Sequence, residues 1–263
     1  TPYQEKRRIV RNFLEGAGLY QAITYSLTSA ELSQKFALKK EETTKLLMPM
    51  SEDRSTLRQS LIPHLLQAAS YNLARQADSA SLYEIGSVFL GKTEEGLPFE
   101  EEHVAFVITG KWVDDAWLGD KRNVDFFAAK GIVEGLLEKL GLTERVTFEK
   151  AAMDGLHPGQ TANILLDGER IGVIGGLHPS ERKEWDLKDT YVAELNLHAL
   201  LRTDAKGVEY EPVPRFPPVT RDIAIEVDRS VPAGELESII RTSGTKLLKA
   251  VKVFDVYEGE NID

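Results

Sequence analysis

Apolar residues recur at three-to-four spacing in three segments, the pattern of helices that bury one face: residues 1–19, 60–76 and 125–141. In the first segment Thr1 can cap the helix, and Pro2 occupies a first-turn position that needs no hydrogen bond. The second segment has Pro63 in its first turn, and Asp125 is the expected cap of the third. A shorter helix is predicted over 29–38.

Alternating or continuous apolar runs predict strands over residues 20–28, 45–48, 81–90, 103–110 and 190–197. In the first run Ile23, Tyr25 and Leu27 are expected to share one face. Asp167-Gly168, between two further apolar runs, predicts a hairpin with a type I′ turn. The acidic stretch 93–102 is predicted to be a solvated loop between two strands. Together these elements predict an α+β domain.

The character of the chain changes near residue 204. Residues 210–222 are rich in proline, which is typical of a linker. A strand, a helix and a second strand are predicted after it, over 222–227, 232–244 and 247–258. This single β-α-β unit has the order of the first half of a split β-α-β sandwich, and alone it has little core to bury.

Composition limits the classes of function. The 263 residues carry a net charge of −10 and no cysteine, so disulfides, thiolate catalysis and cysteine-based zinc sites are excluded. With this acidic balance any RNA contact must come from a local basic patch. No apolar run is long enough for a membrane span and the first residues are not those of a signal peptide, so we expect a cytoplasmic protein without membrane contact.

A metal site is the weaker interpretation of two His-Pro pairs. His157-Pro158 and His178-Pro179 bracket the predicted hairpin, and Glu194 or Asp186 would have to supply a third ligand. The simpler interpretation is that each proline restricts the residue before it and sets the entry to a loop. We therefore expect no metal ligand.

The segments taken together resemble a known family. They include RRIVRNFLEGAGLYQAITYSLTS, DRSTLRQSLIPHLLQAASYNLARQ, LYEIGSVF and HPGQTANILLDGERIGVIGGLHP. In this order they resemble the large (beta) subunit of bacterial phenylalanyl-tRNA synthetases. The resemblance implies a class II aminoacyl-tRNA synthetase-like domain of mostly antiparallel sheet over residues 1–205. It also implies a linker and a truncated ferredoxin-like anticodon-binding domain over 206–263.

The same resemblance implies that this domain has no catalytic residue. Active class II enzymes carry Phe-Arg-x-Glu at the end of such a strand, where the arginine holds phosphate and carboxylate charge. Here the aligned residues are Phe89-Leu90-Gly91-Lys92. The nearest candidate for the glycine-rich third motif, AELNLHALLR, contains no glycine, although Arg202 lies near its end. We expect no catalytic residue, cofactor or metal in this chain, while the parent complex would use ATP and magnesium.

Family membership further implies partners. The beta subunit would join a catalytic alpha subunit in an alpha2beta2 assembly that attaches phenylalanine to tRNA(Phe). The first helix mediates dimerisation in the class, so the subunit-interface candidates are Arg7, Arg11, Phe13 and Leu14, with the two apolar side chains packing on a partner helix. The alternative is an ordinary solvated helix face. Without the alpha subunit the exposed face could drive self-association.

Contacts with tRNA are predicted in the tail. Arg215, Phe216 and Arg221 supply cation, aromatic ring and cation, which suit phosphate contact and base stacking. The alternative is a linker aromatic tucked against the sheet with exposed arginines. Two other functions stay open at this point: a stand-alone ligase with altered motifs, and a free-standing RNA-binding or regulatory paralogue with a degenerate synthetase fold.

Overall fold

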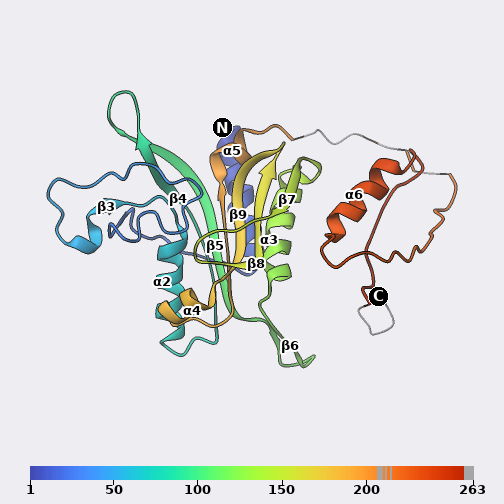
Figure 1. Ribbon diagram of the computed structural model, residues 1–263, viewed down its shortest axis with the longest axis horizontal. Coiled ribbons are helices and arrows are strands. Elements are labelled where there is room, and N and C mark those ends of the chain that lie inside the picture. Colours follow the sequence, from blue (N-terminus) through green and yellow to red (C-terminus); the bar gives the residue numbers. More distant parts are fainter. Residues whose placement is uncertain (206–209, 211, 214, 258–263) are drawn as a thin grey trace. The chain divides into compact units, whose positions relative to one another are not determined.

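The computed structural model describes residues 1–205, 210, 212–213 and 215–257 (Figure 1). Two compact units divide the chain, Thr1–Val208 and Glu209–Asp263. The division lies three residues beyond the expected boundary after residue 205, and each unit is described by itself. No helix in the described ranges has both the length and the apolar character that crossing a membrane requires.

An eight-stranded sheet forms the centre of the first unit, in the order β1-β4-β5-β10-β9-β8-β7, with β6 paired to β5. Every neighbouring pair is antiparallel except β1 and β4. The bounds are β1 Tyr20–Gln21, β4 Ser79–Lys92, β5 Pro98–Asp115, β6 Asp120–Asn123, β7 Val146–Lys150, β8 Leu156–Leu166, β9 Glu169–Leu177 and β10 Thr190–Asn196. The predicted α+β architecture with a largely antiparallel sheet is therefore present.

One face of the sheet packs on α1 (Pro2–Gly16), α3 (Phe126–Lys139) and α5 (Leu197–Arg202). The predicted caps are both made: the Thr1 hydroxyl accepts from the Gln4 amide at 3.4 Å, and an Asp125 carboxylate oxygen accepts from the Ala128 amide at 2.6 Å. The apolar stripe of α3 is buried against the sheet. Local sequence signals thus fixed the two longest helices on this face.

The other face packs on α2 (Ile62–Leu73), with Pro63 in the first turn as predicted. A second apolar cluster forms here from α2, the sheet and side chains near α4 (Pro179–Glu184). A small two-stranded sheet of β2 (Leu27–Thr28) and β3 (Thr56–Leu57) and the 3-10 helix η1 (Glu52–Arg54) complete this side. A second 3-10 helix, η2 (Thr143–Arg145), follows α3.

The segment between α1 and α2 differs from the prediction. The expected strand 20–28 is interrupted, because the backbone and hydroxyl of Thr24 bond to the Glu84 side chain instead of to a neighbouring strand. Residues 29–38 form turns and no helix, and of 45–48 only Lys45 makes a bridge, to Thr56. Tertiary hydrogen bonds here override the local apolar pattern.

Two hairpins show how turn chemistry sets strand ends. At the β8–β9 turn Asp167 and Gly168 have φ of 52° and 86°, as a type I′ turn requires, so this prediction is confirmed. The β4–β5 turn is shorter than predicted: only 93–97 form the loop, and 98–102 continue β5. Acidic side chains in this part of β5 find partners, for example Ser87 for Glu100 and Arg7 for Glu102, so the strand accommodates them.

In the second unit α6 (Ala233–Ser243) forms where a helix was predicted. The strands predicted over 222–227 and 247–258 are not formed in its described residues, and residue 258 lies outside them. In a split β-α-β arrangement the two strands of one unit are not neighbours in the sheet, because another strand lies between them. The segments 222–227 and 247–258 therefore do not pair with each other. The strand prediction was wrong for this chain although its helix was right.

Candidate functional site

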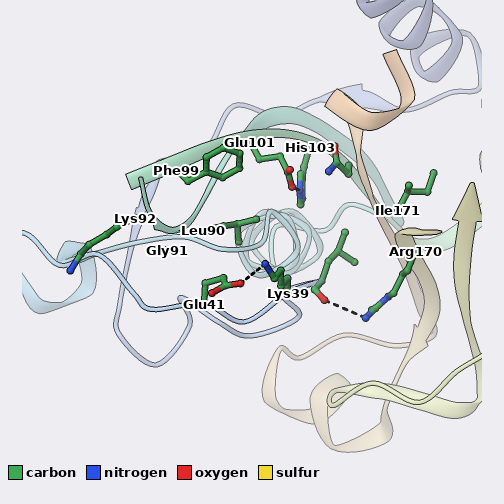
Figure 2. A pocket seen from close by; sticks show the side chains of 12 residues that line it. Lys39, Glu41, Leu90, Gly91, Lys92, Phe99, Glu101, His103, Arg170 and Ile171 are labelled. Atoms are coloured by element: carbon green, nitrogen blue, oxygen red, sulfur yellow. Dashed lines mark hydrogen bonds and ion pairs between the residues drawn. The ribbon is translucent and has the colours of Figure 1, made fainter. Parts of the chain in front are cut away.

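A pocket of about 510 Å³ opens where β4 and β5 meet, at the position of the degenerate second motif (Figure 2). Leu90, Gly91 and Lys92 from the end of β4 line it, opposite Arg170 and Ile171 from the start of β9. The antiparallel sheet brings these strand ends together although they lie about 80 positions apart in the sequence.

The motif residues do not form a phosphate anchor. Leu90 is half-buried and packs with the apolar cluster under α2, so it offers no hydrogen bond. The Lys92 ammonium lies 2.8 Å from a carboxylate oxygen of Glu42. Arg202 is on α5 and does not line the pocket. That this strand end holds no phosphate stays a prediction; in the structure its one cation, Lys92, is paired with Glu42.

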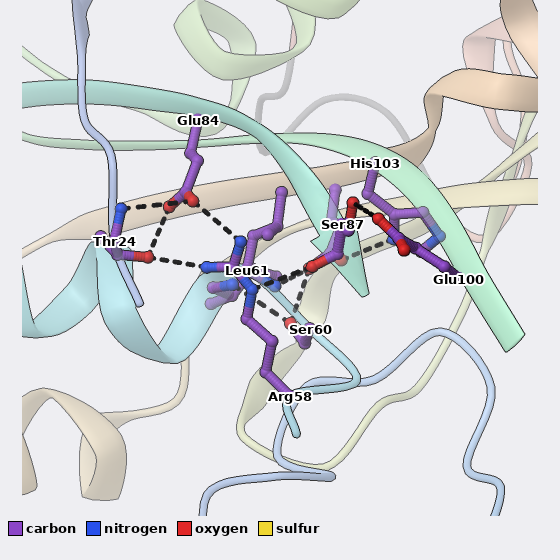
Figure 3. Close-up of polar contacts among 10 residues, drawn as sticks. Thr24, Arg58, Ser60, Leu61, Glu84, Ser87, Glu100 and His103 are labelled. Carbon is purple, nitrogen blue, oxygen red and sulfur yellow. Dashed lines mark hydrogen bonds and ion pairs between the residues drawn. The ribbon is translucent and has the colours of Figure 1, made fainter. Parts of the chain in front are cut away.

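A buried network of ionisable side chains meets the pocket at Glu101 and His103, and Figure 3 shows His103, Ser60 and Leu61 from it. Glu194 accepts hydrogen bonds from the Ser60 hydroxyl at 2.6 Å and the Leu61 amide at 3.1 Å. Its other oxygen lies 2.7 Å from His103 Nδ1, and His103 Nε2 lies 3.0 Å from Glu101. Ser60 and His103 thus share a carboxylate and do not bond to each other, so the serine lacks the base that a nucleophile needs.

This network keeps His103 charged. Burial by itself would lower the pKa of His103, but the hydrogen bonds and charges of Glu101 and Glu194 outweigh it and raise that pKa to about 9. The hydrogen bond from His103 in turn lowers the pKa of Glu101. The group behaves as a fixed structural ion cluster and is not poised for proton transfer near neutral pH.

The raised pKa gives an expected pH dependence. Because His103 titrates near 6.5 when unfolded and about 9 when folded, its contribution is complete below pH 6.5 and is lost as the pH rises through 9. We expect the free energy of unfolding to fall by roughly 2–3 kcal/mol between pH 6.5 and 9.5. Urea denaturation across this range measures it. In His103→Gln the slope should flatten, and an equally steep slope in that variant would contradict the assignment.

A second buried network fixes the segment between α1 and α2 to β4 (Figure 3). The Arg58 guanidinium donates to Glu84 at 2.9 Å, to the Thr24 hydroxyl at 2.7 Å and to the Ser87 carbonyl at 3.0 Å. The Arg58 and Glu84 side chains are each 4% exposed. Gly86 leaves room for the guanidinium, since a Cβ there would lie 2.6 Å from it. None of these four side chains lines the pocket at the end of β4.

The two His-Pro pairs act in their own loops. His157 Nδ1 accepts from the Gly159 amide at 3.0 Å, and His178 Nδ1 accepts from the Ser180 amide at 3.3 Å at the start of α4. Glu194 is occupied by Ser60 and His103. No group of three or more metal-ligating side chains occurs in the part of the chain that the structure describes.

The subunit-interface candidates on α1 divide into two kinds. Leu14 is completely buried in the chain's own core, so the expectation that it packs on a partner helix is corrected. Phe13 is half-buried, and its ring fills the space above Gly135 of α3. Arg11 is exposed, while Arg7 pairs with Glu102 at 2.8 Å. The role of Arg7, Arg11 and the outer edge of Phe13 in an interface stays a prediction.

The tRNA-contact candidates all lie on the surface of the second unit. Arg215, Phe216 and Arg221 are exposed, and Phe216 is not tucked against a sheet within the described residues. Within the described residues the Arg221 guanidinium donates to the neighbouring Thr220 carbonyl, at 2.9 Å. Their contact with RNA stays a prediction.

An exposed apolar surface was missed by sequence reasoning. Five apolar side chains are exposed here, and we call them together the apolar surface: Ile23, Tyr25, Leu47, Met48 and Met50. The two segments that carry it are joined by β2 and β3, and Arg54 stacks on the Tyr25 ring at 3.9 Å. The sequence carries one sign of this surface: the apolar run at 45–48, beside Pro49, has neither a helical nor a strand period. The prediction treats that run as a strand. Exposed apolar side chains mark an interaction site when they form one contiguous patch.

Two family models match the two parts of the chain. Residues 1–197 match the family described as phenylalanyl tRNA synthetase beta chain CLM domain, and residues 214–263 match the ferredoxin-fold anticodon binding domain. A solved structure of pyrrolysyl-tRNA synthetase from Desulfitobacterium hafniense has a TM-score of 0.53 at 15% identity, covering 76% of this chain and 68% of that one. This likeness shows the fold alone.

Curated relatives are similar over the whole chain. The phenylalanine–tRNA ligase beta subunits of Bacillus licheniformis, Bacillus subtilis and Geobacillus kaustophilus are 59%, 57% and 54% identical to it. Each alignment covers 100% of this chain and 33% of the relative, so the chain spans about one third of their length. The family model matches most of the chain, and the relatives are more than half identical to it. The chain therefore belongs to the family of phenylalanyl-tRNA synthetase beta chains.

Proposed function

We infer that this chain is a noncatalytic core of the beta subunit, which braces a catalytic alpha subunit and helps to position tRNA(Phe) during ATP-dependent phenylalanylation. The observation that carries the inference is the strand end at Leu90 and Lys92: a leucine and a lysine paired to Glu42 stand where the class needs free charge to hold phosphate. ATP and magnesium are then used by the parent complex, in a site on the other subunit.

The apolar surface supports the bracing role. Leu47 and Met50 are fully exposed, and Ile23 is nearly so, which is costly for a chain that works alone. The buried Arg58–Glu84–Thr24 network fixes Thr24, which lies between Ile23 and Tyr25 of this surface. An exposed apolar group with a stacked arginine and aromatic ring has the composition of an interface centre.

The test is association with the small catalytic subunit of the same source. We expect the two chains to co-elute in size exclusion with light scattering, and Leu47→Glu/Met50→Glu to weaken the complex about 30-fold or more. Because both side chains are fully exposed, the free energy of unfolding should stay unchanged. Trp117→Glu, at an exposed apolar position in the turn between β5 and β6, is the matched control and should bind normally.

The same samples separate the remaining alternatives. The isolated chain should give no ATP–pyrophosphate exchange, while the complex does. Exchange by the chain alone would contradict the noncatalytic assignment. Association that survives the double substitution but is lost in Arg11→Glu would move the interface to α1. A dimer of this chain alone that the double substitution dissolves would show self-association through the apolar surface.

A further inference from the structure

We propose that the pocket between β4, β5 and β9 binds a small aromatic compound that carries a carboxylate or phosphate group. At about 510 Å³ its volume lies in the range of small-molecule sites. It is built by the ends of four strands together with the segment around Leu38, all within the first unit. The proposal does not depend on any partner subunit.

Part of the pocket wall is apolar. Leu38, Leu90 and Ile171 line it, and the Phe99 ring forms one side with about half of its surface exposed. Phe99 and Arg170 lie on opposite sides of the space (Figure 2). An exposed aromatic ring beside aliphatic side chains offers a flat surface on which another ring can stack.

Of the cations that line the pocket, Arg170 has no acidic partner among the residues that the structure describes. Lys39 lies 2.5 Å from Glu41 and Lys92 lies 2.8 Å from Glu42, so both are already paired. Within the described residues Arg170 donates a 3.3 Å hydrogen bond to the Leu38 carbonyl, and burial lowers the pKa of this guanidinium. Its remaining donors suit the two oxygens of a carboxylate or phosphate.

The opposite end of the pocket accepts hydrogen bonds. Glu101 lines it with a side chain that is 20% exposed, and His103, itself held by Glu194, fixes one carboxylate oxygen. Such a fixed carboxylate can accept from an N–H group of the ligand. An anionic group at Arg170, a ring against Phe99 and an N–H toward Glu101 therefore define the class of ligand.

Two matched probe pairs test the proposal by titration calorimetry on the purified chain. Indole-3-acetate is compared with 3-methylindole, and phenyl phosphate with phenol. We expect saturable one-to-one binding of an anionic probe, weakened about tenfold or more when the anionic group is removed. Tighter binding of indole-3-acetate would identify a carboxylate ligand, and tighter binding of phenyl phosphate a phosphate ligand.

Variants locate the binding. Arg170→Met should weaken the anionic probe about tenfold and leave its neutral partner unaffected, while Phe99→Ala should weaken both. Arg122→Met, at an exposed arginine on β6, is the control and should change nothing. The proposal is overturned if neither anion binds saturably, if Arg170→Met has no effect, or if inorganic phosphate displaces the probes at equal concentration.

Discussion

Replacing Arg58 by methionine is expected to lower the free energy of unfolding by about 3–5 kcal/mol, because it leaves the Glu84 carboxylate buried without its cation. Both side chains are 4% exposed, so water cannot solvate the remaining charge. Thr24 would still donate to Glu84 through its amide and hydroxyl, at 3.3 and 2.6 Å, and this limits the loss. Urea denaturation at pH 7 measures it.

Two further variants test whether the loss comes from the unpaired buried charge. Arg54→Met removes an arginine of η1 that is exposed and only stacks on Tyr25, so its cost should stay below about 1 kcal/mol. Arg58→Met/Glu84→Gln removes both charges and should recover part of the loss, as expected when an unpaired charge is the main penalty. If the double variant loses as much free energy of unfolding as the two single variants lose together, packing and not charge is responsible.

Glu194→Gln is expected to cost a similar 3–5 kcal/mol, although it changes a single atom of the side chain. Glu194 is completely buried and accepts from three donors: the Ser60 hydroxyl, the Leu61 amide and His103. A glutamine keeps one accepting oxygen and turns an amide group toward one set of these donors, so at least one buried donor loses its partner. It also removes one of the two charges that keep His103 protonated.

The measurement combines stability with pH. In Glu194→Gln the free energy of unfolding should fall at pH 7, and the slope between pH 6.5 and 9.5 should be shallower than in the parent chain. Glu149→Gln on β7 is the matched control, since Glu149 is exposed and should change neither quantity. Ser60→Ala combined with Glu194→Gln should cost less than the sum of the two, because they share a hydrogen bond.

Part of the candidate site could be read from the sequence. The substitutions at Leu90 and Lys92 are visible in a single strand end, and in the structure Leu90 packs on the apolar cluster while Lys92 pairs with Glu42. The pocket beside them was not predicted, because Phe99 was placed in a loop and Arg170 in an ordinary hairpin strand. Neither residue carries a local signal for binding until the sheet places it beside Leu90.

The expectation that Leu14 packs on a partner helix failed for the same reason, because local sequence does not show which element covers a helix face. The spacing of Phe13 and Leu14 predicts an apolar stripe, and the stripe exists. Periodicity alone does not distinguish a stripe that meets α3 of the same chain from one that meets a partner. The structure resolves this by packing Phe13 over Gly135 and burying Leu14, and it places large exposed apolar side chains in the irregular segment after α1.

Local sequence signals specify the caps at Thr1 and Asp125, the stripe of α3 and the turn at Asp167-Gly168, because each depends on partners within a few residues. The conformation between α1 and α2 and the burial of its ion networks depend instead on tertiary contacts. Those rest on hydrogen bonds between residues 60 positions apart, as for Thr24 and Glu84, or 134 apart, as for Ser60 and Glu194. Such bonds have no local period, since they form only after the sheet has brought distant segments together.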